Sequence, residues 1–138
     1  MDNNEIILPE NLIDLDHGLL SSYLVRVGYR LTELLSLLPE AKANEKNCKM
    51  SHKILRAEAV IKSLHIDELK TESLRKAYSE CAVEVKQAKD DYIKAVETYS
   101  RTESLIKKYE NLYTTCSRVI TLKDQKLREE TLSGKVSP

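Results

Sequence analysis

The sequence predicts an all-α fold for a chain with few turn-forming residues. Its 138 residues include only three Gly and three Pro, with no Trp and no Phe. Charged residues make up 32%, which is typical of long helices with polar faces. Apolar residues recur at alternating steps of four and three, the spacing that aligns side chains on one helix face. We therefore expect a helical hairpin and one long helix, unbroken or interrupted at a weak point, that assemble into an oligomeric helical bundle or ring.

Residues 1–16 should form an acidic, extended N-terminal arm ahead of the first helix. Ile6 and Ile7 precede Pro9, and acidic residues such as Asp14 follow. The sequence offers no hairpin partner for this segment. Its apolar residues could therefore form a short strand or dock on a neighbouring subunit.

Residues 17–66 predict the helical hairpin. Its first helix has an apolar line with four-three spacing: Leu20, Leu24, Val27, Leu31, Leu34 and Leu38. Pro39 disfavours helical geometry at the residue before it, while its own fixed φ suits the first turn of a helix, so we expect the turn there. The second helix should bury a line that Asn47 interrupts, here named the apolar line of residues 43–64: Ala43, Met50, Ile54, Ala57, Ile61 and Leu64.

A basic stripe accompanies that line, and its five cations are Lys42, Lys46, Lys49, Lys53 and Arg56. The stripe lies about 100° around the helix from the apolar line. It could be a solvated face partnered by Glu45 and Glu58. However, residues 39–65 hold six cations against three acids. In a ring of subunits the stripe would form a groove that follows a phosphate backbone without reading sequence, so we take it as the candidate DNA-binding site.

Residues 67–131 predict a long helix, with Asp67 or Thr71 as its N-cap. Its apolar positions, here named the long seam, alternate by four and three: Leu74, Tyr78, Cys81, Val85, Ala88, Tyr92, Ala95, Tyr99, Thr102, Ile106, Tyr109, Tyr113, Cys116, Ile120, Lys123 and Leu127. A helix of about 60 residues would be ~90 Å long, whereas the two hairpin helices offer only ~30 to 40 Å each. Half of the seam would then lack a partner in its own chain. Residues 132–138 should be a frayed tail.

Two arrangements would cover the remaining seam. The helix could fold back at a stretch of low helix propensity, either residues 98–102 or residues 114–115. Alternatively the chain could self-associate, which we favour. The candidate oligomerisation residues are Tyr99, Ile106, Tyr109, Tyr113, Cys116, Ile120 and Leu127. The tyrosines of the seam could also stack on bases, but packing is the simpler interpretation.

The sequence carries no motif of a catalytic or metal-binding protein. It contains no nucleotide-binding loop, no HExxH and no GxSxG. His17, His52 and His65 belong to different expected elements, and Asp90 and Asp91, as helix neighbours, point about 100° apart. We therefore expect a protein that acts by binding, with no enzymatic activity, metal or cofactor.

Charge and cysteine usage place further bounds on function. Twenty-two Lys and Arg balance twenty-two Asp and Glu, so any nucleic-acid role must come from local clustering. Three widely spaced cysteines without a CxxC pair favour a reducing, cytoplasmic setting. No apolar run approaches the ~20 residues that cross a bilayer, and the first residues are acidic where a signal peptide is positive. We expect a cytoplasmic protein with no membrane or small-molecule partner.

The order of these parts resembles a known family. An acidic arm precedes a short hairpin with a basic second helix, and a long helix then opens with residues 70–78 (KTESLRKAY). The late segment from residues 117–120 (SRVI) through residues 126–129 (KLRE) adds to the similarity. Together with chain length, these features resemble the UvsY-type recombination mediators of tailed bacteriophages.

The resemblance implies a homo-oligomer that binds single-stranded DNA. It also implies that the oligomer helps load a RecA-like recombinase onto strands covered by a single-strand-binding protein, in the host cytoplasm. DNA contact would fall on Lys53 and Arg56, with Lys46 and Lys49 as neighbours, and self-association on residues 99–127. The family's Leu-Lys-Ala-Arg cluster occurs here only as ILRA, with its lysine displaced to Lys53.

A different class of protein fits the same helices. A structural or adaptor coiled coil, such as a virion assembly chaperone or a protein-binding inhibitor, would use its apolar faces to bind protein. The absence of any oligonucleotide binding at low salt would favour this alternative over the recombination mediator.

Overall fold

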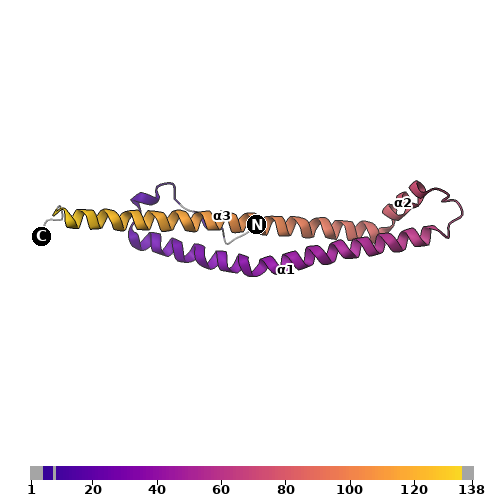
Figure 1. Cartoon of the computed structure of the whole chain (residues 1–138), viewed down its shortest axis with the longest axis horizontal. Helices are drawn as coiled ribbons and strands as arrows, with labels where there is room; N and C mark the ends of the chain where they lie inside the picture. Colours follow the sequence, from indigo (N-terminus) through magenta and orange to yellow (C-terminus); the bar gives the residue numbers. More distant parts are fainter. Residues whose placement is uncertain (1–4, 8, 135–138) are drawn as a thin grey trace. The chain divides into compact units, whose positions relative to one another are not determined.

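The computed structural model describes residues 5–7 and 9–134 and contains only helices as regular elements in that part of the chain. A short 3-10 helix, η1 (Leu12–Asp14), precedes α1 (His17–Ser63), α2 (Glu72–Cys81) and α3 (Val83–Leu132), as Figure 1 shows. The all-α prediction is confirmed. Most of the predicted tail, residues 135–138, lies outside the described residues.

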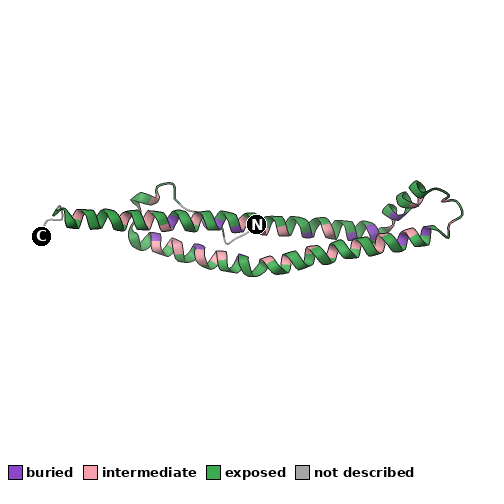
Figure 2. Ribbon diagram, in the orientation of Figure 1, coloured by how far each residue is buried: buried purple, intermediate pink, exposed green. Residues whose placement is uncertain are grey.

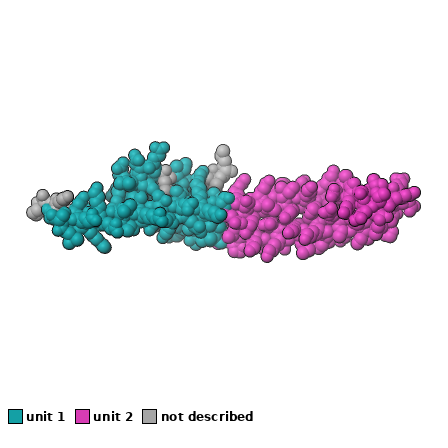
Figure 3. Space-filling model, turned by 45° about the horizontal axis from the view of Figure 1, so that its top comes forward, with its two compact units in different colours: residues 1–35, 104–138 teal, residues 36–103 magenta. Residues whose placement is uncertain are grey.

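The chain divides into two compact units, which Figure 3 distinguishes by colour. Unit 1 combines residues 1–35 with residues 104–138, and unit 2 is the continuous stretch of residues 36–103. Each unit therefore contains one part of α1 and one part of α3, and unit 2 also contains α2.

Large apolar side chains form the core of unit 1. Leu20 and Val27 of α1 are fully buried, and so are Tyr109 and Cys116 of α3. The predicted line from Leu20 to Leu34 therefore faces inward, and the exposed faces of both helices appear green in Figure 2. Burial of a large apolar side chain is worth roughly 1.5–3 kcal/mol, so each of these residues contributes substantially to the stability of unit 1.

The N-terminal arm docks on α3 of its own chain. Ile6 is buried, and its N–H donates to the Tyr109 hydroxyl at 3.2 Å. Lys108 forms an ion pair with Glu5 at 2.5 Å, and the Lys123 ammonium donates to the carbonyl oxygen of Leu15. Of the two alternatives for the arm, a strand is absent from its described part, and docking occurs on α3 of the same chain.

Helix α1 continues through Pro39, so the predicted turn at that residue is wrong. A proline inside a helix removes one backbone hydrogen bond and crowds the carbonyl of residue i−4, at a cost of ~3 kcal/mol or more. On either side of Pro39, α1 packs within a unit against part of α3. Residues 40–46 are also mostly strong helix formers. Packing and propensity together outweigh the local cost, and the expected hairpin becomes one helix.

The apolar line of residues 43–64 is exposed, contrary to prediction. Met50, Ile54 and Ile61 keep 58%, 50% and 58% of their surface accessible. The residues of α1 that face the interior of unit 2, here named the inner line, are buried or half-buried: Ala41, Glu45, Cys48, His52, Leu55, Ala59 and Ser63. At 100° per residue the two lines lie about 180° apart on the helix. The inner line is more polar than the outer one, which is why apolar periodicity selected the wrong face.

The N-cap of α2 agrees with the prediction, but the helix breaks at a position that was not predicted. Thr71 is the N-cap of α2, because its hydroxyl accepts from the N–H of Leu74 at 3.2 Å. The helix then breaks at Ala82, whose φ of −61° and ψ of 135° are extended. Both predicted weak points remain helical within α3.

At those weak points the threonine hydroxyls of α3 are hydrogen-bonded within the helix. Each of four threonine hydroxyls donates to the carbonyl four residues earlier: Thr98, Thr102, Thr114 and Thr115. Such bonds satisfy the hydroxyls but slightly destabilise a helix, so the packing of α3 along the long seam is what offsets the low propensity of these stretches. Long-seam members from Val85 to Lys123 are mostly buried or half-buried, whereas Leu74 and Tyr78 in α2 are exposed.

Because α1 is one continuous helix, the argument that half of the long seam lacks a partner in its own chain no longer holds. A helix of 47 residues is about 70 Å long at 1.5 Å per residue. Ile106, Tyr109 and Cys116 are buried within unit 1 by the chain itself. The length of α3 therefore no longer requires an oligomer, and any self-association must use surfaces that remain exposed.

Candidate nucleic-acid interface

The basic stripe lies on one side of α1 within unit 2. Lys42, Lys46, Lys49 and Lys53 are exposed, and Arg56 is half-buried. Within residues 5–7 and 9–134, none of the four lysines has an ion pair. The stripe lies about 100° from the inner line, so its ammonium groups flank the packed face of α1.

Arg56 connects the stripe to α2. Its Nη2 forms an ion pair with Glu80 Oε1 at 3.1 Å. The two side chains retain 43% and 60% of their exposure, so the pair adds little stability and stays open to solvent. A phosphate could therefore compete with Glu80 for the guanidinium at small cost.

A small cavity of about 220 Å³ lies beside this pair, and through Lys89 it extends the basic surface from α1 to α3. His52 and Arg56 line it from α1, Glu80 from α2, and Val85 and Lys89 from α3. Lys89 was not identified from the sequence, because nothing in the periodicity of α3 indicated that it would lie close to Arg56. Its place directly after the long-seam residue Ala88 is the only local signal.

The opposite side of unit 2 has a different character. A groove of about 430 Å³ is lined there by Asn47, Cys48, Ser51 and Leu55 of α1 and by Glu84, Gln87, Ala88 and Asp91 of α3. Gln87 donates to the Asp91 carboxylate at 2.9 Å. The charged residues of this groove are both acids, in contrast to the basic stripe on the other side of α1.

The predicted oligomerisation residues divide into a buried and an exposed set. Ile106, Tyr109 and Cys116 are buried, and Tyr99 and Ile120 are half-buried. Tyr113 and Leu127 remain exposed at 42% and 56%. A second copy could reach only the exposed members without opening unit 1.

Two residues of the long seam have perturbed ionisation. A hydrogen bond to the Glu103 carboxylate, with smaller contributions from desolvation and from Glu45, raises the pKa of Tyr99. Burial raises the pKa of the Cys116 thiol. Both groups are therefore kept neutral, which suits packing and does not suit nucleophilic chemistry.

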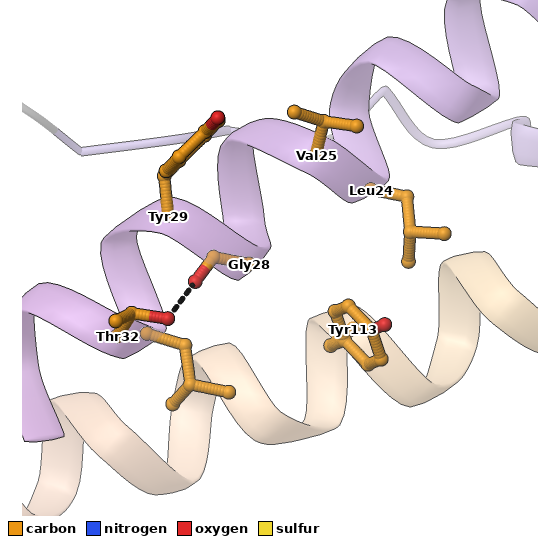
Figure 4. Close-up of a pocket in the computed structure, with 7 residues that line it drawn as sticks. Leu24, Val25, Gly28, Tyr29, Thr32 and Tyr113 are labelled. Atoms are coloured by element: carbon orange, nitrogen blue, oxygen red, sulfur yellow. Dashed lines mark hydrogen bonds between the residues drawn. The ribbon is translucent and has the colours of Figure 1, made fainter.

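A groove in unit 1 lies beside Gly28, with a volume of about 430 Å³. Figure 4 shows Tyr113 of α3 facing Gly28 and Leu24 of α1, and Thr32 donating to the Gly28 carbonyl at 2.9 Å. A Cβ on Gly28 would lie 3.6 Å from the Tyr113 ring, an ordinary contact. This open groove has no charged lining residue and offers no chemistry for a phosphate.

Neither a metal centre nor a membrane span is found in the described residues. No group of three or more His, Cys, Asp or Glu there could hold a metal ion. Across residues 5–7 and 9–134, no helix is both long enough and apolar enough to cross a membrane. Cys48, Cys81 and Cys116 are free thiols.

Comparison with protein-family models, with curated proteins and with solved structures finds no match for this chain.

Proposed function

We propose that this protein binds single-stranded DNA along the basic side of unit 2 and acts by binding alone. The supporting observation is the uneven distribution of charge in that unit. Four exposed lysines line one edge of α1, and Arg56 and Lys89 meet at the cavity beside them. The opposite groove carries only the acids Glu84 and Asp91 as charged residues. A strand of phosphates would be attracted to one side and repelled from the other.

The chemistry of that side fits a flexible backbone better than a base sequence. Lysine ammonium groups are mobile point charges that neutralise phosphates without fixed geometry. No Tyr, Trp or Phe belongs to the stripe or lines the cavity beside it, where the ring of His52 is half-buried. Base stacking would therefore contribute little, and affinity should depend steeply on salt and weakly on sequence.

The biological role that we propose follows the resemblance to the UvsY-type mediators. A homo-oligomer would hold single-stranded DNA and help load a RecA-like recombinase onto strands covered by a single-strand-binding protein. The protein would make and break no bond.

A titration with a labelled oligothymidylate tests the DNA-binding proposal. The triple variant Lys49→Ala, Lys53→Ala and Arg56→Ala should lose at least 10-fold in affinity at low salt. Its plot of log affinity against log salt should be shallower by about 2, because each lost contact to a single strand removes ~0.7.

A matched control removes the same charge from α3 in unit 1. The variant Lys107→Ala, Lys126→Ala and Arg128→Ala changes three exposed cations outside the proposed site. It should bind as the unmodified chain does. Equal losses in the two triple variants would mean that only net charge matters, and unchanged binding in the first would remove the basic stripe from the proposal.

The exposed apolar line of residues 43–64 favours a second candidate function, a structural or adaptor coiled coil. Exposed contiguous apolar surface is typical of protein interfaces. This candidate is distinguished by the same titration, since an adaptor shows no binding to the oligonucleotide even at low salt.

A further inference from the structure

The apolar line of residues 43–64 is an unpartnered helix face in unit 2. Its large members, Met50, Ile54 and Ile61, are at least half exposed. Leu64, in the turn that follows α1, is 55% exposed and continues the line. The four-three spacing persists over three heptads, which is the pattern of a coiled-coil seam.

Helix α1 cannot turn this face inward without losing its existing contacts. The inner line on the other side of the helix includes Ala59 and Ser63, which are 8% and 0% exposed. Covering the apolar line therefore requires a different molecule.

We propose that a second copy of this chain covers the apolar line, as a parallel, in-register, two-stranded coiled coil. In heptad terms, Asn47, Ile54 and Ile61 occupy the a positions, and Ala43, Met50, Ala57 and Leu64 the d positions. β-Branched residues at a favour two strands when Leu occupies d, as Leu64 does here, and a single Asn at an a position specifies register and oligomeric state. In the parallel pair Asn47 meets its own counterpart and the two amides can hydrogen-bond.

The charges beside the seam select the same orientation. Lys53 occupies a g position and Glu58 the following e position, so each Lys53 faces Glu58 of the second copy in a parallel pair. An antiparallel pair would instead place the lysines at Lys46 and Lys53 opposite one another, which is repulsive. It would also set Asn47 against an apolar d residue, leaving a buried amide without a partner.

This dimer does not depend on the proposed DNA binding. Lys42, Lys49 and Arg56 occupy c positions, which point away from the seam, so the dimer leaves their exposure unchanged, whereas Lys46 and Lys53 occupy g positions at its edge. A monomer would therefore remove the homo-oligomer from the proposed role but leave the DNA-binding surface. Because Lys53 takes part in both proposals, sedimentation of the DNA-binding triple variant accompanies its titration, so that a lost dimer and a lost phosphate contact are told apart.

The first test is sedimentation of the whole chain at ~1 to 100 µM, with helicity followed by circular dichroism. The unmodified chain should dimerise, and Ile54→Glu with Ile61→Glu should weaken the dimer by on the order of 100-fold or more while keeping its helicity. Ile93→Glu is the control, because Ile93 is 44% exposed on α3, away from the seam. A monomer at 100 µM, or a dimer that tolerates the double variant, would overturn the proposal.

A second test measures orientation without depending on the charged variants. Asn47→Cys and Ile61→Cys are made separately in a Cys48→Ser, Cys81→Ser background and oxidised. Both should form disulfide-linked dimers, since a parallel pair sets each position opposite itself. An antiparallel pair can do so for only one of them. Linkage of one variant alone, or of neither, would contradict the parallel arrangement.

A charge exchange gives the third test. Lys53→Glu alone should weaken the dimer, and Lys53→Glu with Glu58→Lys should restore it. Equal affinity of the single and double variants would mean that these two residues do not face each other.

Discussion

Unit 1 and unit 2 are built from the same two helices but bury different kinds of side chain. The buried residues of unit 1 are mostly large, among them Leu20, Val27 and Tyr109. Those of unit 2 are small, with Val85 the largest beside alanines and serines such as Ala95 and Ser63. Several large aliphatic residues of unit 2 remain exposed, as at Ile54, and Leu55 of the inner line is only half-buried.

The difference shows in which unit the chain buries large apolar side chains by itself and in which it leaves them exposed. Small residues at a helix contact bury little area per residue, and area removed from water sets the apolar stabilisation at about 25 cal/mol per Å². Unit 1 buries several large side chains in its core, although others such as Val25 and Tyr29 stay exposed. Unit 2 leaves a regular line of large aliphatic residues on a face that points to solvent, beside the basic stripe.

The largest effect is expected from truncating the core of unit 1. Tyr109→Ala should lower the free energy of unfolding by ~3–5 kcal/mol, because it leaves a cavity and removes the acceptor for the Ile6 N–H. Ile54→Ala, measured in dilute solution where the chain is monomeric, should cost less than ~1 kcal/mol. Urea unfolding followed by circular dichroism compares the two. A larger loss at Ile54 would reverse the contrast between the units.

Thiol reactivity gives the next largest contrast. Cys116 is fully buried with a raised pKa, whereas Cys81 is exposed. A raised pKa lowers the thiolate fraction at any given pH, and burial requires an opening before attack. Near neutral pH we expect Cys116 to react with an alkylating reagent on the order of 100-fold more slowly than Cys81, as mass spectrometry of the modified peptides would show. Similar rates would mean that unit 1 is open.

Replacing the proline inside α1 should stabilise the protein. Pro39→Ala restores a backbone donor and removes the clash with residue 35, worth ~3 kcal/mol, and loosens the unfolded chain by ~0.4–1 kcal/mol. The net gain in unfolding free energy should be about 2 kcal/mol in a denaturant titration, with Glu40→Ala as a neutral control. A loss of stability would indicate that Pro39 forms a turn.

The smallest effect is expected at the start of α2. Thr71→Ala removes the cap hydrogen bond to Leu74 and should cost ~1 kcal/mol. Asp67→Ala should change the free energy of unfolding by less than ~0.5 kcal/mol, because the structure assigns the cap to Thr71. Equal losses at the two positions would contradict this assignment.

Sequence periodicity predicted unit 1 well because the apolar and polar faces of its helices are distinct. Leu20 and Val27 lie on the only leucine-rich line of their segment, and both are buried. In unit 2 the inner line contains Glu45 and His52, so it is less apolar than the face that stays exposed. Periodicity alone could not choose the correct face there.

The remaining differences come from tertiary contacts that no local pattern contains. Pro39 is tolerated because α1 packs on both sides of it, and Lys89 lies close to Arg56 only because α1 and α3 pair. The break at Ala82 has no Gly or Pro to mark it. The spacing of the lysines was enough to find the basic stripe, but only the structure shows which charged residues of α3 lie beside it and which line the opposite groove.

The division of the chain also bears on the order of folding. Unit 2 is one continuous stretch of sequence, whereas the Glu5–Lys108 contact of unit 1 joins residues 103 positions apart. Closing so long a loop is entropically slow unless the intervening segment is already compact. Pairing within unit 2 brings Glu45 near Tyr99 and shortens that loop. We therefore expect the less apolar half of the molecule to nucleate first and the better-packed half to close last.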